Sequence, residues 1–448
     1  MFSRLSFLFL LYYVAIGMTQ PQNRFLFLYP FRIAQLAFII ALVFHIMAVM
    51  QEEKPLIRFG PATIIACILL VWGMIAQYFG PMIAGTHWNG YIDQLVKSCL
   101  AVILLEATAL NIYRVWAVMG TILLSTLWWM KAGLRLGTAG ATYAGDRIMG
   151  PAVSMVENPN GYAFFTCVTI VVYLYFYQQY KNKYLKMGFL AMAIASIWIV
   201  FNTGSRTGMV MLVAMAFFLF PKYGGKHKVA LLVTIALIPL LLGSIGAMNM
   251  ERFRTIPDSI RAFWSGEELD LGMTTGADDH SAVERKLKNR DTWALIKDYP
   301  FLGAGMNPSS SEMANRGYTY ATGQVHNELL MAGRQMGFLG VALYLSMLVV
   351  TFQRGWKVQR YAKGWWPAMA DLGWSFKMMA LIILVGGQFN PLPWNTYTMV
   401  LLGAASALWM NLQRGMIYPD SLAGLSVSQP AQTPDQPTPA LARSATTG

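Results

Sequence analysis

The chain is poor in charged side chains. Only 12% of its 448 residues are Asp, Glu, Lys or Arg, and 56% are hydrophobic. Soluble globular domains average about 25% charged residues. This composition excludes an ordinary soluble enzyme and predicts a membrane protein.

Cysteine and histidine are also scarce. The three cysteines, Cys67, Cys99 and Cys167, all lie in apolar stretches, so neither a disulfide framework nor a cysteine zinc site is expected in a polar loop. No two of the five histidines have the H-E-x-x-H spacing, and we therefore expect no protein-bound catalytic metal and no cofactor. The chain also lacks an evident internal or inverted repeat, which counts against many transporter folds.

About twelve apolar stretches approach the length of about 20 residues that a bilayer crossing needs. The predicted fold is therefore all-α, a polytopic membrane protein with about twelve transmembrane helices. The first stretch is interpreted as an uncleaved anchor, because Arg4 precedes it and no small-residue cleavage site follows. The predicted spans are residues 4–19, 31–50, 60–79, 93–110, 112–130, 160–178, 187–202, 207–221, 229–249, 328–352, 373–389 and 394–411.

The net charge of +13 is distributed unevenly along the chain. Alternate short loops carry clusters of Lys and Arg, such as Lys181, Lys183 and Lys186, whereas the opposite loops carry fewer. This positive-inside pattern places both termini in the cytoplasm and the loop 250–327 outside, which in the inner membrane of a bacterium means the periplasm. Topology and contact with membrane lipids therefore explain the basic charge, and no nucleic acid is expected as a partner.

The predicted organisation is one transmembrane domain, residues 1–419, followed by a disordered cytoplasmic tail. The tail, 420–448, is rich in Pro, Ala, Ser, Thr and Gln. Within the periplasmic loop 250–327, residues 281–298 contain many good helix formers and predict a helix. Residues 299–305 contain Pro and Gly and predict a turn that ends it. Long polar loops on a rigid scaffold are common places for functional sites.

His326 stands where this loop re-enters the membrane. An unperturbed histidine has a pKa of about 6.5 and can accept a proton near neutral pH. The alternative is an interfacial histidine that only bonds to backbone. Position alone does not separate these two interpretations.

Several arginines are predicted on the same side of the membrane as His326. Arg206 lies in a short turn beside hydrocarbon, where it either snorkels or clamps an anion. Arg285 and Arg290 belong to a basic run before Trp293, which is either a solvated helix face or a set of cations beside the base. Arginines around one base at a bilayer, without a metal, suit a lipid-linked pyrophosphate, because its leaving group gains negative charge in the transition state.

The other exported loop, 131–159, leads into Glu157-Asn158-Pro159-Asn160-Gly161. Asn and Pro there indicate a helix start. The alternative is that this segment lines a polar site shared with the large loop. Arg147 would then be a further cation near the substrate.

Four motifs together resemble one known family, the bacterial O-antigen ligase and Wzy-type polymerase superfamily. They occur in the family's order over about residues 158–340, and their order, spacing and predicted topology are more specific than any one alone. The motifs are Asn158-Pro159-Asn160-Gly161-Tyr162-Ala163; Gly204-Ser205-Arg206-Thr207-Gly208; Arg290-Asp291-Thr292-Trp293 with Asp298-Tyr299-Pro300-Phe301-Leu302-Gly303-Ala304-Gly305; and His326-Asn327-Glu328-Leu329-Leu330 with Gly337-Phe338-Leu339-Gly340.

The resemblance implies a GT-C-like, metal-independent glycosyltransferase that inverts the anomeric carbon. Such a protein moves a glycan from undecaprenyl pyrophosphate to an acceptor hydroxyl. His326 would be the base, and Arg206 and Arg290 would hold the pyrophosphate, with Arg285 as a second candidate because the spacing from arginine to Trp293 varies. The remaining implied substrate-binding residues are Asn160, Asn327 and Arg147. Arg334 departs from the pattern, since an acidic residue is common near that position, and this leaves the support around His326 open.

The expected function is that of a ligase that attaches the lipid-linked glycan to lipid A core or to another acceptor. One alternative is a polymerase that joins repeat units, since it would use the same donor chemistry. Another is a polysaccharide or lipid transporter, which would need charged residues deep in several spans. Lys97, Glu106 and Lys377 are the few candidates for such charges.

Overall fold

The structure, a computed structural model, describes residues 1–83, 90–139, 147–150, 156–223, 277–364, 366–390 and 393–413. Throughout these ranges the chain is helical and forms no strand, apart from an isolated bridge between Ile83 and Pro308. The predicted span 229–249, the first part of the large loop and the tail 420–448 lie outside the described residues.

Each predicted span within the described ranges coincides with a long helix, so an all-α polytopic membrane protein is confirmed. Among the described residues, seven helices are long and apolar enough to cross a membrane, and the number of twelve stays a prediction. α5 is not among the seven and carries Asp93, Lys97 and Glu106. The long helices are α1 (Phe2–Thr19), α3 (Ile33–Glu52), α4 (Pro61–Phe79), α5 (Gly90–Thr108), α6 (Ile112–Ala139), α7 (Pro159–Gln179), α8 (Lys183–Asn202), α9 (Arg206–Tyr223), α15 (Glu328–Ala362), α16 (Pro367–Gly386) and α17 (Thr396–Gln413).

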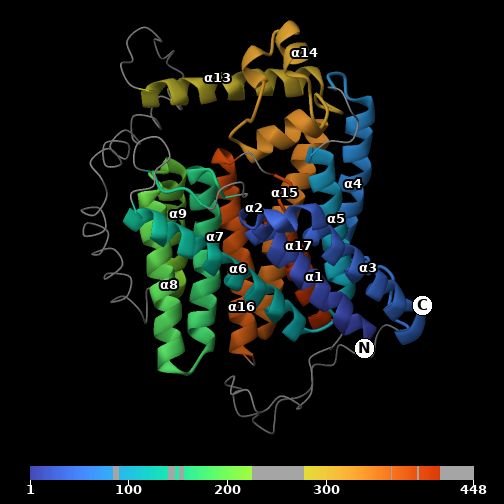
Figure 1. Cartoon of the computed structure of the whole chain (residues 1–448), viewed down its shortest axis with the longest axis vertical. Helices are drawn as coiled ribbons and strands as arrows, with labels where there is room; N and C mark the ends of the chain where they lie inside the picture. The colour runs from blue at the N-terminus through green and yellow to red at the C-terminus, as the bar shows by residue number, and fades with distance from the viewer. Residues whose placement is uncertain are drawn as a thin grey trace.

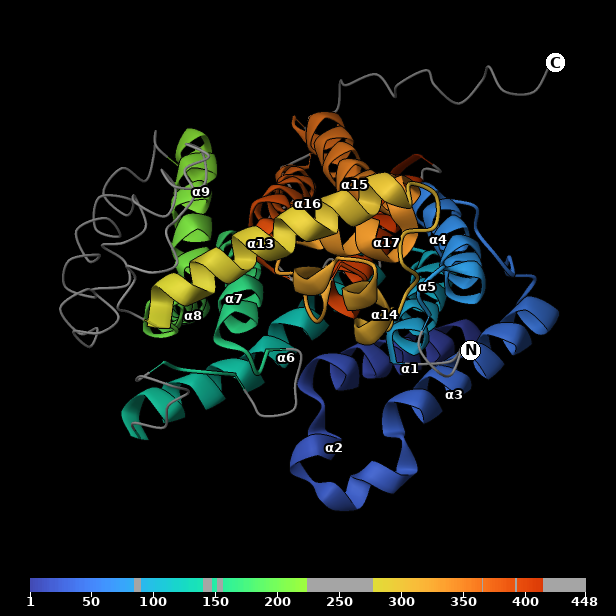
Figure 2. The same cartoon turned by 90° about the horizontal axis from the view of Figure 1, so that it is seen from above.

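A small cap covers one end of this bundle. It consists of α13 (Ala277–Asp298), α14 (Ser310–Asn315) and the short helix η2 (Thr319–Ala321). α13 lies across the top of the bundle in Figure 1 and, seen from above in Figure 2, runs from over α8 to over α15. The predicted helix at 281–298 is therefore confirmed, with its start four residues earlier. The cap has a core of its own, formed by Met82, Leu295, Ala304, Met313 and Ala321.

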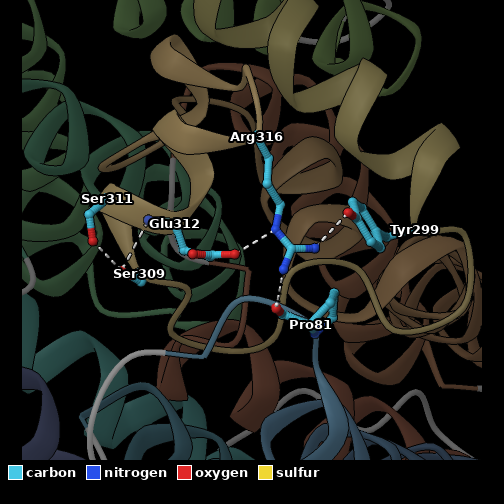
Figure 3. Close-up of polar contacts among 6 residues, drawn as sticks. All are labelled: Pro81, Tyr299, Ser309, Ser311, Glu312 and Arg316. Carbon is cyan, nitrogen blue, oxygen red and sulfur yellow. Dashed lines mark hydrogen bonds and ion pairs between the residues drawn. The ribbon is translucent and has the colours of Figure 1, made fainter.

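Arg316 fastens the cap to the connection after α4. Its guanidinium donates to Glu312 at 2.7 Å, to the Tyr299 hydroxyl at 2.9 Å and to the Pro81 carbonyl at 3.3 Å (Figure 3). The Ser309 amide adds a bond of 2.6 Å to the Met82 carbonyl. Contacts of this kind give the cap a fixed place over the bundle.

α15 bends near its start, where the sequence predicted one uninterrupted span. Met336 and Gly337 leave the helical conformation, and Gly337 has a φ of 66°. The freed groups find other partners: the Trp72 indole donates to the Met336 carbonyl at 3.1 Å, and the Phe338 amide donates to Pro300 at 2.8 Å. A Cβ at Gly337 would overlap the Pro300 carbonyl. The glycine is thus required both for the bend and for the turn packed against it.

The turn after α13 packs on the same bend through a second glycine. Gly303 has a φ of 61°, and a Cβ there would overlap the Arg334 carbonyl. The next amide, that of Ala304, donates to this carbonyl at 2.6 Å. The two glycine-containing motifs of the sequence therefore meet in space, and together they fix the cap against the first turns of α15.

Candidate functional site

His326 lies immediately before α15, at the end of the bundle under the cap. Asn327 begins the helix as its N-cap, and its side-chain oxygen accepts from the Leu330 amide at 3.0 Å. The amide nitrogen of Asn327 donates to Gln388 at 3.2 Å. The oxygen and the nitrogen of this side chain therefore both help to fix the start of α15. This structural role is enough to explain why an asparagine follows the histidine, and it requires no contact with a substrate.

The imidazole of His326 is mostly buried and is strongly disposed to be neutral. Its pKa is lowered from 6.5 to about 4, mainly by burial and in smaller part by the nearby cations Arg285 and Lys288, while Glu284 opposes the shift. Its Nδ1 atom has no hydrogen-bond partner among the described residues. A neutral ring with an unpartnered nitrogen can accept a proton, as a general base requires.

One flank of α13 brings cations to His326. Thr292, Leu295 and Ile296 are fully buried against the cap and bundle. Arg285 and Lys288 are three residues apart and continue this flank toward the helix start, so the flank changes from apolar to cationic there. Lys288 also forms an ion pair of 2.7 Å with Glu284, whose pKa that bond lowers.

Arg290 lies on a different flank of α13. Its side chain is 68% exposed and pairs with the adjacent Asp291 at 3.2 Å. Asp291 in turn accepts from the Tyr320 amide at 3.0 Å, which ties α13 to η2. Of the two α13 arginines that the sequence proposed for the pyrophosphate, Arg290 and the second candidate Arg285, only Arg285 is among the charges that act on His326.

A second polar cluster forms where α7 and α9 begin. Arg147 donates to the Thr203 carbonyl at 2.8 Å and to the Asn160 side chain at 3.2 Å. The Ser205 hydroxyl donates to the same Asn160 oxygen at 2.9 Å, and Arg206 is the first residue of α9. The predicted helix start at Asn158 is confirmed, because its side chain accepts from the Asn160 amide at 2.8 Å. The same segment also forms a polar corner with Arg147 and Arg206.

The end of α16 connects the two clusters. A Cβ added at Gly386 would lie 2.5 Å from the Met211 sulfur in α9 and 2.6 Å from the Phe164 ring in α7. Two residues later, Gln388 bonds to Asn327 at 3.2 Å. His326 and Arg206 thus lie on either side of the end of one helix, and packed helices are about 8–10 Å apart.

Arg334 supports the segment that leads to His326. It is 3% exposed, and its guanidinium donates to the Ala321 carbonyl at 2.7 Å and to the Gly323 carbonyl. The sequence identified this arginine only as a departure from the family pattern. Its role requires the turn 321–323 to lie beside α15, a contact between segments that no local pattern predicts.

Glu328 is a second buried residue that the sequence did not propose for the site. It is 0% exposed, and its carboxyl group accepts from the Tyr344 hydroxyl and from the Asn390 amide at 2.7 Å. A carboxyl group buried among apolar side chains needs a hydrogen-bond or charge partner, because its burial without one is costly in free energy. The bonds hold the start of α15 against the segment between α16 and α17.

Comparison with known proteins gives one family. Residues 190–345 match the family model described as O-Antigen ligase. The matched region extends from α8 into α15 and includes the positions of Arg206, Arg285 and His326. No curated protein matches the chain. The family match confirms the superfamily that the four motifs indicated.

Proposed function

We propose that this multi-pass membrane protein transfers a glycan from undecaprenyl pyrophosphate to an acceptor hydroxyl, as an O-antigen ligase does. The observation that carries the proposal is the partly buried imidazole of His326, whose Nδ1 atom has no partner among the described residues and which lies near the cations Arg285 and Lys288 of α13. His326 is the base, and the cationic flank of α13 together with the Arg206 corner forms the pyrophosphate site. The positive-inside pattern puts this site in the periplasm, on the outer face of a bacterial inner membrane.

In this mechanism His326 takes the proton of the acceptor hydroxyl as its oxygen attacks the anomeric carbon. The bond from that carbon to the pyrophosphate oxygen breaks on the opposite face, so the configuration inverts. Arg285, Lys288 and Arg206 stabilise the charge that develops on the leaving group, because fixed cations need no reorganisation during the reaction. No step requires a metal.

Binding of the donor would also adjust the base. A diphosphate near Arg285 and Lys288 offsets the cations that depress the pKa of His326. The imidazole would become a stronger base once the donor is in place. The bound donor would thus raise the basicity of His326, the group that activates the acceptor hydroxyl.

The contacts of the charged residues within the predicted spans support a transferase more than a transporter. Glu106 accepts from the Thr63 amide at 2.9 Å and so caps α4. Lys97 pairs with Asp93 at 2.5 Å, and Lys377 bonds to Gln359 at 2.9 Å. Each has a local structural partner, whereas a transport route needs charges that line a continuous path.

The acceptor distinguishes a ligase from a polymerase, since both use the same donor chemistry. The experiment is therefore transfer in vitro from a purified lipid-linked donor, with lipid A core and lipid-linked repeat units offered as separate acceptors and with a chelator present. We expect transfer to lipid A core that the chelator does not reduce. Product formed only with repeat units would establish the polymerase.

Two variants test the residues in the same assay. His326→Ala should abolish transfer while the protein stays in the membrane, and full transfer by that variant would remove the base assignment. Arg285→Gln should lose more transfer than Arg290→Gln, which makes the same change on the other flank of α13. The reverse order would move the pyrophosphate contact to Arg290.

A further inference from the structure

α13 has a third flank that neither the cap nor the proposed site uses. Asp291 and Asp298 are seven residues apart and bond to η2, through the Tyr320 amide and the Tyr318 hydroxyl. Successive residues of a helix turn by about 100°. The flank that faces away from η2 therefore carries Lys286, Arg290, Trp293 and Lys297, at spacings of four, three and four residues. We refer to these four residues as the outer flank.

Trp293 joins the outer flank to an exposed apolar side of α15. Its ring contacts that of Phe338 edge-on, with centroids 6.0 Å apart, and remains 47% exposed. Phe338 and Leu339 are 44% and 37% exposed although they belong to a candidate membrane span. Phe301, in the turn packed on the bend of α15, is 75% exposed. These four side chains form an apolar patch where the bundle meets the cap.

The cations are arranged around this patch. Lys297 lies one turn after Trp293 and Arg290 one turn before it, and both are exposed. A tryptophan among Lys and Arg, next to the lipid-facing end of a span, is the pattern of a helix at the headgroup level of a bilayer. Basic side chains near such a surface attract anionic lipids.

We propose that the outer flank of α13 binds the anionic headgroups of the leaflet on the cap side, with Trp293 and Phe301 in the interface. This contact fixes the height of α13 above the membrane. The opposite flank, with Arg285 and Lys288, is thereby held at the level where lipid phosphates lie. The proposal gives Arg290, which also pairs with Asp291, a lipid phosphate as a further partner.

Immersion of the patch can be measured with a spin label on Phe301→Cys, which leaves the outer flank intact. The full-length protein, in a Cys67→Ser background, is reconstituted in vesicles of phosphatidylglycerol and phosphatidylethanolamine. Collision with oxygen, which concentrates in lipid, is compared with collision with a water-soluble nickel chelate. A label on Asn315→Cys, exposed on α14, is the matched control. We expect oxygen to dominate at 301 and the nickel chelate at 315; equal nickel access at both sites would overturn the proposal.

The charges are tested in the same vesicles. The reference is the protein with an unaltered outer flank in vesicles of phosphatidylcholine, which carry no net charge. Replacing Lys286, Arg290 and Lys297 together by Gln should raise the access of the nickel chelate to the label at 301, in anionic vesicles, to this reference value. If the triple variant keeps the low access seen with anionic lipid, the electrostatic part of the proposal is refuted. The assay follows depth and not glycan transfer, so its outcome is independent of the proposed reaction.

Discussion

The depressed pKa of His326 makes a quantitative prediction about pH. For a pKa of about 4, about 90% of the free enzyme holds a neutral imidazole at pH 5, against about 3% for an unperturbed pKa near 6.5. If neutral His326 is the base, kcat/KM for glycan transfer at pH 5 should stay close to its value at pH 7. An unperturbed base would instead lose about 25-fold between pH 7 and pH 5.

The assay is initial-rate transfer from the lipid-linked donor in detergent between pH 4 and 8, with kcat and KM determined separately. The profile of kcat/KM reports the free enzyme and that of kcat the enzyme with substrate bound. The bound diphosphate favours the imidazolium, so the acid limb of kcat should lie at higher pH than that of kcat/KM. An acid limb of kcat/KM centred near pH 6.5 would refute the reasoning.

The charges next to His326 provide the matched control for this profile. Lys288→Gln removes a cation that lowers the pKa of the imidazole, so the acid limb of kcat/KM should move to higher pH. Glu284→Gln removes the opposing anion, so the limb should move to lower pH. A profile that shifts in the same direction in both variants would show that the limb belongs to another group.

The remaining predictions concern single positions. Arg206→Lys should reduce transfer about tenfold or more, since a charge-assisted bidentate contact contributes about 1.5–3 kcal/mol; unchanged kcat/KM would indicate mere snorkelling. Arg334→Met should lower kcat and broaden the NMR signal of His326, with partial rescue by Lys, because each carbonyl left without a donor costs about 1–3 kcal/mol; a variant with full kcat would show that the turn needs no support. Gly337→Ala should destabilise the protein by about 1–3 kcal/mol in thermal unfolding, whereas Gly188→Ala, in open space within α8, should not.

The helices of the bundle were predictable because the solvent imposes a simple rule. Within a bilayer every backbone polar group must be bonded internally, so an apolar stretch of sufficient length is a helix. The predicted starts at residues 160 and 207 fall one residue from those of α7 and α9. The bend in α15 was missed because residues 328–352 were taken as one apolar span, although Arg334 and Gln335 immediately precede the bend. Gly337 is required there because a side chain would overlap the carbonyl of Pro300, which belongs to another segment of the chain.

For the site, the sequence predicted residue types, and their roles and the side of the membrane on which they lie stay predictions. The motifs identified His326 and several arginines, but a run of basic residues does not tell which ones face the bundle. That choice depends on the rotation of α13, which is fixed by the bond of Asp291 to Tyr320 and the packing of Ile296 on Gly333. These contacts join segments about thirty residues apart or more and leave no local pattern in the sequence.

The buried charges near His326 show a further reason why composition does not reveal function. Arg334 and Glu328 are both almost fully buried. A rule based only on the free-energy cost of burying a charge would assign both residues to the substrate site. Each instead has partners from the protein: Arg334 holds two carbonyls before His326, and Glu328 holds Tyr344 and Asn390 behind it. An unpartnered nitrogen does not by itself separate these residues, because Arg334 Nε and His326 Nδ1 both lack a hydrogen-bond partner among the described residues. What separates them is that the Arg334 guanidinium and the Glu328 carboxyl group bond to neighbouring segments and so build the frame. The imidazole of His326 makes no such structural bond through Nδ1, and it is the group that we propose for the chemistry.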